Sequence, residues 1–356
     1  MRLVMEKAKP KFKKRLTILI VAVLTIFLAV VGYYLYQLFI VPKLTKLNIP
    51  TLPYPRQSVV YVYRIEANGL TATFGGQEMS APQVTTELEK DMKNIKSNGF
   101  DGVKLNYAFQ ANNYLANRIA LRASQQGLYP IGVLEGHRVK PKDRAFTSAE
   151  IGEWQKFVRD TVNANKNIIY FWEIWNEPSI DLFKYGSPEE FVQLLKVTYP
   201  IIKEINPSAK VVVTLSAEGR DNTGFEDKVL TLGGGDYFDI LSFHPYGANP
   251  YLQENQIKEA FVREQSLVTK YNNRWPLVIG EIGQPTSEVS EEEQARLAKF
   301  VYSEAAKHNI PVTWYYWSDE RMPKNFIWSE GNANWGLVRF DGTKRPILNA
   351  IKEFLQ

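Results

Sequence analysis

Two glutamates stand where buried strands run out. Glu177 lies near the end of Phe171–Pro178, "FWEIWNEP", and Glu281 lies in Pro276–Gly283, "PLVIGEIG". Each follows an apolar run typical of a core β-strand. Burying a carboxylate there costs free energy unless the group is paired, protonated or needed for function. Two carboxyl groups about 5–5.5 Å apart can hydrolyse a glycosidic bond with retention, because one donates a proton while the other attacks the anomeric carbon. Proximity itself pushes their pKa values apart, since like charges disfavour double ionisation.

Seven of the eight predicted strands end in polar or aromatic groups that could contact a ligand, and further side chains of this kind accompany the two glutamates. They are Lys104, Asn106, Glu135, His137, Asn176, Ser216, His244, Tyr246 and Trp317. The carboxyl ends of the strands in a parallel barrel meet at one rim, where the active residues of such folds lie. Packing alone does not explain this concentration, so we expect a ligand site at that rim.

Eight strand candidates alternate with amphipathic helical stretches from residue 57 onward. The strand candidates are Ser58–Ile65, Asp101–Tyr107, Tyr129–Gly136, Asn167–Trp175, Lys210–Ser216, Asp239–Tyr246, Pro276–Gly283 and Pro311–Trp317. Between them, Ile151, Trp154 and Val158 have the spacing of a one-sided helix, and Ser187 with Glu190 forms a capping-box pattern. Eight strand–helix repeats predict a (β/α)8 TIM barrel. An open doubly wound sheet is the alternative, but no glycine-rich phosphate loop follows the first strand.

The composition is typical of a globular protein, with 45% hydrophobic residues among 356. The absence of cysteine excludes disulfides and thiolate chemistry, and three histidines argue against a zinc site. The net charge of +5 arises in residues 1–46, where nine basic residues and one acidic residue contribute +8, so the remainder carries −3. This weakly acidic part gives no electrostatic reason to expect nucleic-acid binding.

The N-terminal part predicts a membrane anchor. Leu16–Val41 contains no charge over 26 residues, and about 20 suffice to cross a bilayer. Seven of the nine basic residues precede this run, so the N-terminus is expected in the cytoplasm. A cleaved signal peptide is disfavoured, because its apolar region spans only about 7–15 residues and no small-x-small site follows here. The predicted organisation is a cytoplasmic basic tail at 1–15, a transmembrane anchor at 16–41, a linker at 42–56 and an extracytoplasmic catalytic domain at 57–356.

The motif Trp172–Pro178, "WEIWNEP", together with "PLVIGEIG", resembles the catalytic signature of the clan A retaining glycoside hydrolases. Members of that clan are (β/α)8 barrels with an Asn-Glu pair after strand four and a glutamate after strand seven. Within that clan, the chain resembles family 5, which holds cellulases and mannanases, and family 39, which is xylosidase-type. The tail Trp335–Phe354 is also similar to theirs, and the resemblance covers residues 57–356.

Carried over position by position, the resemblance implies roles for the two glutamates. Glu177 would be the acid/base and Glu281 the nucleophile. Asn176 would bind the sugar 2-hydroxyl, a contact that strengthens in an oxocarbenium-like transition state.

The resemblance also implies a set of substrate-binding residues. His244 and Tyr246 match positions that line the site, with Tyr246 donating to the nucleophile, and Trp317 matches the tryptophan that forms the floor under the sugar. Lys104 is a departure, because many members carry arginine at the end of strand two. An ammonium group can still hold the nucleophile ionised, but it lacks the planar fork of arginine.

Several residues have a structural interpretation beside the functional one. Glu173 lies four positions before Glu177, so strand alternation places the two side chains on the same face. Glu173 is expected to be a buried structural residue, with Lys104 as its candidate partner. Glu135 and His137 either bind substrate or belong to a surface loop, and the two interpretations weigh equally. Trp172, Trp175 and His308 are expected to be structural, whereas Arg64, Glu66, Phe326 and Trp328 stay undecided.

These expectations combine into one hypothesis, a membrane-anchored retaining glycosidase that cleaves β-linked O-glycosidic bonds by double displacement, without a metal or organic cofactor. Its partners would be an oligo- or polysaccharide substrate and the lipid bilayer, through residues 16–41, and its catalytic domain would be monomeric. Two alternatives stay open at this point. One is a non-catalytic glycan-binding barrel displayed at the membrane, and the other is a transglycosylase, which uses the same two carboxylates.

Overall fold

The computed structural model describes residues 54–61, 64–65, 72–74, 77–79, 81–136, 144–180, 183–217, 224–246, 253–319, 334–339 and 341–355. All of them belong to one compact unit, Leu47–Gln356. The predicted basic tail, the predicted anchor and most of the predicted linker lie outside the described residues. Within the described ranges, no helix is long and apolar enough to cross a bilayer.

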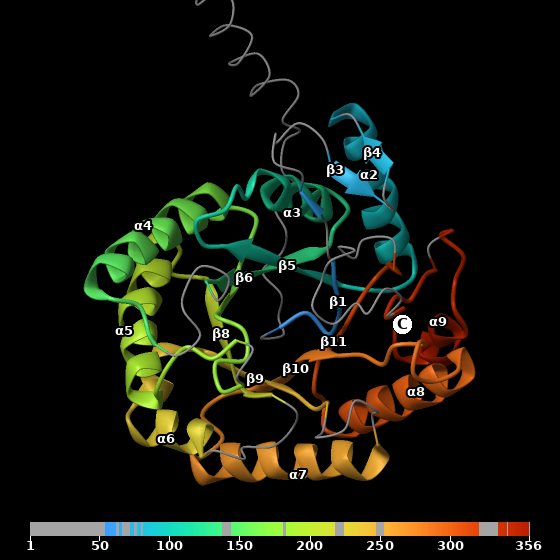
Figure 1. Ribbon diagram of the computed structural model, residues 1–356. Coiled ribbons are helices and arrows are strands. Elements are labelled where there is room, and N and C mark those ends of the chain that lie inside the picture. Colours follow the sequence, from blue (N-terminus) through green and yellow to red (C-terminus); the bar gives the residue numbers. More distant parts are fainter. Residues whose placement is uncertain are drawn as a thin grey trace, which may run out of the picture. The chain divides into compact units, whose positions relative to one another are not determined.

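Eight parallel strands close into a barrel at the centre of the molecule (Figure 1). In chain order they are β1 (Gln57–Val60), β5 (Gly102–Ala108), β6 (Tyr129–Glu135), β7 (Phe171–Ile174), β8 (Lys210–Ala217), β9 (Ile240–His244), β10 (Leu277–Ile282) and β11 (Val312–Trp314). The sheet closes because β1 pairs with both β11 and β5. The predicted (β/α)8 barrel is therefore confirmed, and the open doubly wound sheet is excluded.

Helices surround the barrel on its outside (Figure 1). They are α2 (Ala81–Ser97), α3 (Tyr114–Gln125), α4 (Ser148–Asn165), α5 (Pro188–Ile205), α6 (Phe225–Thr231), α7 (Glu254–Lys270), α8 (Glu291–Lys307) and α9 (Pro346–Ala350), with single 3₁₀ turns at η2 (Gly234–Tyr237) and η4 (Lys352–Phe354). The predicted capping box of Ser187 and Glu190 begins α5, and Thr147 with Glu150 begins α4 in the same way.

The lumen of the barrel is filled by a layer of apolar side chains from successive strands. Five strands contribute one residue each, and Tyr54 completes the cluster with Ile131, Phe171, Val212, Ile240 and Val278. Side chains along a strand alternate between its two faces, so the residue two positions further on faces the same lumen. The layer above this cluster is accordingly formed by Glu173, Thr214 and Ser242, all of them buried.

The first barrel strand is shorter than predicted. The sequence pattern suggested one strand from Ser58 to Ile65, but β1 ends at Val60. Its predicted extension instead forms β2 (Arg64–Ile65), which pairs antiparallel with β3 (Ala72–Phe74), and β3 pairs with β4 (Gln77–Met79). This small sheet lies outside the barrel, and the sequence pattern did not predict it.

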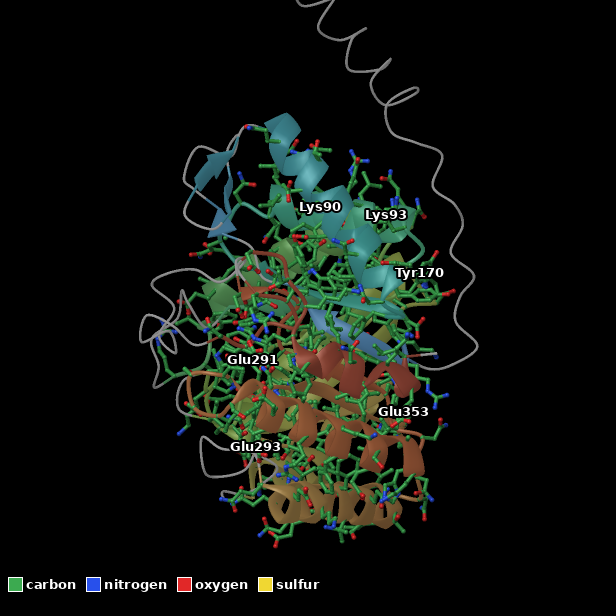
Figure 2. The ribbon with its side chains drawn as sticks, turned by 90° about the vertical axis from the view of Figure 1, so that its right-hand side faces the viewer. Lys90, Lys93, Tyr170, Glu291, Glu293 and Glu353 are labelled. Atoms are coloured by element: carbon green, nitrogen blue, oxygen red, sulfur yellow. The ribbon has the colours of Figure 1, made fainter. Side chains whose placement is uncertain are left out.

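The chain beyond β11 is joined to α8 by ion pairs. Glu291, labelled at the start of α8 in Figure 2, pairs with Arg339 and, at 3.1 Å, with Arg345. Arg345 is 3% exposed and also pairs with Asp319 at 2.7 Å, while it donates to the carbonyl oxygen of Gly336. These bonds hold the segment after Gly336 against the residues that follow β11.

Candidate active site

The turn after β7 presents the first of the two predicted glutamates. Trp175 and Glu177 both have positive φ angles, 66° and 45°. Non-glycine residues rarely occupy this left-handed region, so the surrounding packing must hold them there. The buried ring of Trp175 packs edge-on against Phe146, and its indole N–H donates to the carbonyl oxygen of Phe183 at 2.7 Å. Trp175 is thus structural, as predicted, and it fixes the turn that carries Glu177.

β9 and β10 bring three further predicted residues to the same place. His244 is the last residue of β9, and its Nδ1 lies 2.7 Å from Oε1 of Glu177. The hydroxyl of Tyr246 donates to Oε1 of Glu281, on β10, at 2.9 Å. Gly280 permits this approach of the strands, because a Cβ at that position would lie 3.1 Å from Nε2 of His244 and closer still to Ser242.

The two glutamates face each other at the carboxyl end of the barrel. One carboxylate oxygen each from Glu177 and Glu281 and a ring nitrogen of His244 all lie within 4.8 Å of one another. Glu177 is 6% exposed and Glu281 is half-buried. Three donor atoms this close could also bind a divalent cation, but the hydrogen bond between His244 and Glu177 already joins two of these residues.

The surroundings of Glu281 shift its ionisation. Burial raises the pKa of the Glu281 carboxyl above its ordinary value, and the charge of Glu177 adds to the increase, while His244, Lys104 and the hydroxyl of Tyr246 oppose it. Burial, with the charges of Glu281 and Glu177, also raises the pKa of Tyr246 well above its ordinary value. The phenol therefore stays protonated and can keep donating to the carboxylate.

A buried ion pair lies beneath these groups. Nζ of Lys104 is 2.7 Å from Oε2 of Glu173 and donates to the carbonyl oxygen of Gly280 at 3.0 Å. Burial acts to lower the pKa of Lys104, but Glu173, Tyr54 and Glu281 together outweigh it, so the pKa lies above its ordinary value. The prediction that Glu173 is the buried partner of Lys104 is confirmed. With 2% of its side chain exposed, Lys104 acts on Glu281 through its charge rather than by touching a ligand.

Two aromatic residues that the sequence analysis did not select lie near Glu281. The ring of Trp335 meets those of Tyr315 and Tyr246 edge-on, with centroids 5.3 Å and 6.3 Å apart. Burial raises the pKa of Tyr315 well above its ordinary value, and the nearby charges of Tyr316 and Glu281 contribute. Both Tyr315 and Trp335 remain half-buried, in contrast to the enclosed aromatic residues of the core.

The predicted sugar-binding floor, Trp317, lies elsewhere. Its side chain is 2% exposed within the main hydrophobic core, and its ring packs edge-on against Phe100 with centroids 6.2 Å apart. A ring enclosed in this way offers no face to a sugar, so this placement corrects the prediction. Tyr315, two residues earlier, is the half-exposed aromatic at this strand end. The signal for Tyr315 was the run of four aromatic residues from Trp314 to Trp317, but strand alternation alone does not say which of them faces the site.

The remaining predicted residues have different outcomes. Asn176 is half-buried beside Glu177, and its side chain makes no hydrogen bond to any residue that the structure describes. Glu135 ends β6 and is 4% exposed, so the surface-loop interpretation does not hold for it. His137 lies outside the described residues, as do Glu66, Phe326 and Trp328, and only the backbone of Arg64 is described.

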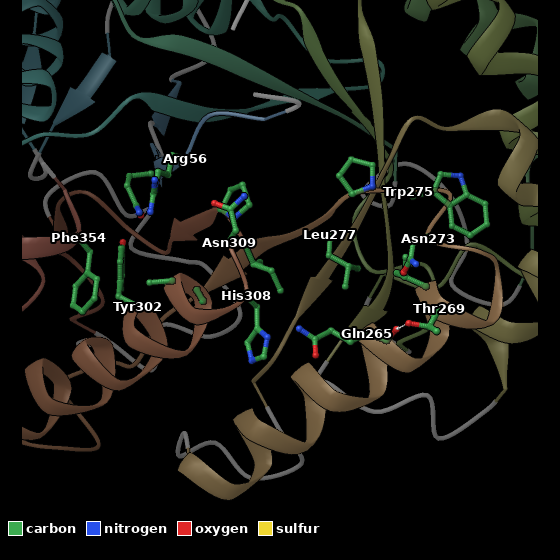
Figure 3. A pocket seen from close by; sticks show the side chains of 17 residues that line it. Arg56, Gln265, Thr269, Asn273, Trp275, Leu277, Tyr302, His308, Asn309 and Phe354 are labelled. Carbon is green, nitrogen blue, oxygen red and sulfur yellow. Dashed lines mark hydrogen bonds between the residues drawn. The ribbon is translucent and has the colours of Figure 1, made fainter. Parts of the chain in front are cut away.

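A pocket of about 680 Å³ lies at the other rim of the barrel (Figure 3). Its lining comes from the amino ends of β1, β10 and β11, with Arg56, Leu277 and Asn309, and from the ends of α7 and α8, with Thr269 and His308. The amino and carboxyl ends of parallel barrel strands lie at opposite rims. This pocket is therefore separate from the two facing glutamates.

Comparison with known proteins places the barrel among glycoside hydrolases. Residues 67–321 match the family described as Cellulase (glycosyl hydrolase family 5). The structure is similar to a family 39 glycoside hydrolase from the gut symbiont Bacteroides cellulosilyticus WH2, with a TM-score of 0.63 and 19% identity over 85% of this chain and 64% of that one. It is also similar to a GH5_18 protein from Streptomyces cattleya, solved in complex with Manβ1-4GlcNAc, with a TM-score of 0.64 and 14% identity over 85% and 80% of the two chains.

A third similar structure is xylanase 10B from Thermotoga maritima, with a TM-score of 0.58 and 14% identity over 85% of this chain and 95% of that one. A search of curated proteins finds no match. These structural likenesses, at 19% identity or less, show the fold, and the chain spans less than two thirds of the family 39 protein. The family match is more specific, because it extends over most of the barrel and includes both rim glutamates. The chain therefore belongs to glycosyl hydrolase family 5, the cellulase family.

Proposed function

We propose that this chain is a retaining glycoside hydrolase that cleaves a β-linked O-glycosidic bond by double displacement. The observation that carries the proposal is the approach of Glu177 and Glu281 to within 4.8 Å. Retaining enzymes hold their two carboxyl groups about 5–5.5 Å apart, whereas inverting enzymes leave about 6.5–9.5 Å for a water molecule. The short separation supports retention, and membership of family 5 supports a glycan substrate.

The two glutamates would act in two steps. In the first, Glu281 attacks the anomeric carbon, the bond from that carbon to the leaving oxygen breaks, and the proton of Glu177 passes to that oxygen. In the second, a water molecule attacks the same carbon, Glu177 takes a proton from the water, and the ester bond to Glu281 breaks. The sugar leaves with its original anomeric configuration, and both glutamates return to their starting states.

The surroundings of each glutamate support this division of roles. Glu281 receives a hydrogen bond from Tyr246 and lies in the field of Lys104, and both favour the ionised form that a nucleophile requires. Glu177 instead shares a 2.7 Å hydrogen bond with His244, a side chain that can itself accept or donate a proton. That arrangement suits a residue that gives up a proton in one step and regains it in the next.

Two substitutions and one covalent label test the proposal. Glu177→Gln should lower kcat on natural glycosides by about 10²–10⁴-fold, the range of general acid–base catalysis. The same variant should keep the first step on aryl glycosides whose leaving group needs no proton. Glu281→Gln should abolish turnover on both kinds of substrate. The exposed Glu292→Gln is the matched control and should retain wild-type rates. Near-wild-type activity of Glu281→Gln would refute the assignment.

A 2-fluoro glycosyl fluoride separates the proposal from its alternatives. A retaining enzyme should trap this probe as a glycosyl ester on Glu281, which peptide mass spectrometry locates. Binding to glycan arrays without any label would instead indicate a glycan-binding barrel. Labelling accompanied by transfer of the sugar to added glycan acceptors, in place of water, would indicate a transglycosylase.

The similar structures suggest which glycans to test. One is a GH5_18 protein solved with Manβ1-4GlcNAc, one is an exo-β-1,4-mannosidase from Opitutaceae bacterium strain TAV5, and one is a xylanase. We therefore include β-mannosides, β-xylans and β-glucans in a hydrolysis screen. Product lengths from the active substrate would distinguish cleavage at chain ends from internal cleavage.

The predicted membrane anchor forms a separate part of the proposal. The uncharged run Leu16–Val41 and the basic residues before it support an N-terminus inside the cytoplasm and a barrel outside it. The full chain should stay in the membrane fraction after extraction with alkaline carbonate. An N-terminal tag should be protected from protease in intact cells, whereas the barrel should be accessible once any outer envelope is permeabilised. Release of the chain by carbonate would count against the anchor.

A further inference from the structure

Thr214, on β8, lies at the centre of a buried hydrogen-bond cluster below the two glutamates. Its side chain is 1% exposed. Its Oγ1 lies 2.7 Å from Oε1 of Glu173, 2.8 Å from Oγ of Ser242 and 3.4 Å from Nε2 of His244. The other ring nitrogen of His244 is the one that meets Glu177, at 2.7 Å. A single hydroxyl therefore connects the ion pair of Lys104 and Glu173 with the predicted acid/base.

The number of protons in this cluster decides the direction of each bond. A threonine hydroxyl carries one proton and two lone pairs, and an ionised carboxylate can only accept. Glu173 forms an ion pair with Lys104, and hydrogen bonds to a charged acceptor are the stronger ones. Thr214 is the donor in its bonds with both Glu173 and Ser242, so its one proton is engaged there and it can only accept from Nε2 of His244.

It follows that Nε2 of His244 must carry a proton in order to bond with Thr214. With Nε2 protonated, a neutral His244 has only a lone pair on Nδ1. The 2.7 Å contact between Nδ1 and Glu177 then requires one shared proton, which lies on either the carboxyl oxygen or the ring nitrogen. Without that proton, two lone pairs would face each other at hydrogen-bond distance.

We propose that Thr214 is a positioning residue that fixes the Nε2–H tautomer of His244 and thereby keeps a transferable proton in the His244–Glu177 pair. The inference rests on the proposed function, because it gives the proton of that pair its use as the acid of the first step. Thr214 does not touch the substrate and acts only through His244. The Nδ1–H tautomer would instead donate to an ionised Glu177 and leave no proton for the leaving oxygen.

Other titratable groups surround the pair and stay unchanged in this comparison. Glu173 lies on β7, Lys104 on β5 and Glu281 on β10, and their charges act on the same region. Tyr246 follows β9, while Tyr315 and Tyr316 follow β11, and all three phenols interact with one another or with Glu281. Substitutions at Thr214 leave these groups in place, so a change in the pH profile can be assigned to the tautomer.

The tautomer can be measured without any substrate. The full chain, in detergent, is labelled with 15N-histidine, and long-range 1H–15N spectra are recorded across the pH range. The chain has three histidines, so a His244→Asn variant identifies the signals of His244. The expected result is an imidazolium or an Nε2–H ring at every pH. An Nδ1–H ring in the wild-type protein would overturn the proposal, whether or not the chain hydrolyses glycosides.

Two substitutions of Thr214 give the matched comparison. Thr214→Ser keeps the hydroxyl and should preserve the Nε2–H tautomer. Thr214→Val removes the hydroxyl that accepts from Nε2 of His244. The Nδ1–H form of His244 should therefore appear as the pH rises and the His244–Glu177 pair loses its shared proton. Thr198→Val is the stability control, because Thr198 is also buried and accepts a hydrogen bond, from Trp154, at 2.9 Å far from this cluster. If Thr214→Val does not fold, Thr214→Ser and the wild-type spectrum still decide the outcome.

Kinetics supplies the second readout. In Thr214→Val the alkaline limb of kcat/KM should move to lower pH by about half a unit to one unit, the size expected for one lost hydrogen bond. Thr214→Ser and Thr198→Val should keep the wild-type limb. An unchanged limb in Thr214→Val, with wild-type tautomer signals, would refute the role of Thr214. If the fluoro-sugar does not label Glu281 in the wild-type protein, the proposed function is refuted instead.

Discussion

Lys104 and Glu173 form an ion pair inside the barrel, with 2.7 Å between Nζ and Oε2 and side-chain exposures of 2% and 0%. The carboxylate accepts a further bond from Thr214, and the ammonium donates to the carbonyl oxygen of Gly280. The pair thus joins β5, β7, β8 and β10 below the two facing glutamates. Its positive end also acts on Glu281, which makes it part of the electrostatics of the candidate site.

Removal of one member of this pair should be strongly destabilising. Lys104→Met leaves the charge of Glu173 buried and unpaired, so the free energy of unfolding should fall by about 3–5 kcal/mol. The double variant Lys104→Met/Glu173→Met should lose less, because no isolated charge remains. Urea denaturation measures all of these values. The exposed pair of Lys156 and Asp160 is the control, and Lys156→Ala should change stability by less than about 0.5 kcal/mol. A double variant as unstable as Lys104→Met would contradict this account.

Tyr246→Phe should change the acidic side of the pH profile. The Tyr246 hydroxyl opposes the rise in the pKa of Glu281 that burial causes, so its removal should raise that pKa further. Because the nucleophile must be ionised, the acidic limb of kcat/KM should move to higher pH, by about one unit. At the optimum, kcat should fall by about 10–100-fold, as expected for a hydrogen bond to a charged group.

The control for Tyr246→Phe is Tyr199→Phe. Tyr199 also bonds a carboxylate, Asp239, but on the outside of the barrel. Its pH profile should match that of the wild type. Equal shifts in the two variants would show that the effect comes from general destabilisation rather than from the bond to Glu281.

Glu264, on α7, should make stability depend on pH. It is wholly buried and pairs with Arg263, and burial raises its pKa above the ordinary value. The folded state therefore holds this proton more tightly than the unfolded state does. The resulting stability is complete below the unfolded pKa of about 4.5 and is lost as pH rises through the folded pKa, with a slope of at most about 1.4 kcal/mol per pH unit.

Glu264→Gln should remove that slope. Urea titrations between pH 4 and about pH 8 should show a flatter dependence of the unfolding free energy than in the wild type. Glu259→Gln, at an exposed position of the same helix, should leave the slope unchanged. A wild-type slope in Glu264→Gln would show that Glu264 is not the responsible group.

The aromatic residues after β11 should divide into two classes. Tyr315→Ala and Trp335→Ala remove half-buried rings near Glu281, so KM should rise on the order of 10–100-fold if a sugar stacks there. Trp317→Phe should lower the melting temperature and leave KM near its wild-type value, because Trp317 is in the core. Steady-state kinetics and calorimetry on all three variants check this. A large rise in KM for Trp317→Phe alone would restore it as the floor.

Much of the fold could be predicted from local pattern. The eight strands could be recognised because each is a short apolar run, and the helical stretches between them repeat their apolar residues every three to four positions. Eight such strand–helix repeats are compatible with few architectures. The helix start at Ser187 follows from the capping box that it forms with Glu190, three positions later. The sequence also suggested Lys104 as the partner of a buried Glu173, whose strand alternation matches that of Glu177.

The amino-acid sequence by itself therefore determined the type of barrel, the rim at which its polar residues gather and the two carboxylates that could do chemistry there. Only the tertiary structure decided that these carboxylates approach to within 4.8 Å, because that distance depends on barrel closure and on Gly280. It also decided that Tyr315 and Trp335, rather than Trp317, lie beside Glu281. Arg345 holds the segment that carries Trp335 through bonds to Asp319 and Gly336. Such contacts join residues far apart in the chain, and no local periodicity encodes them.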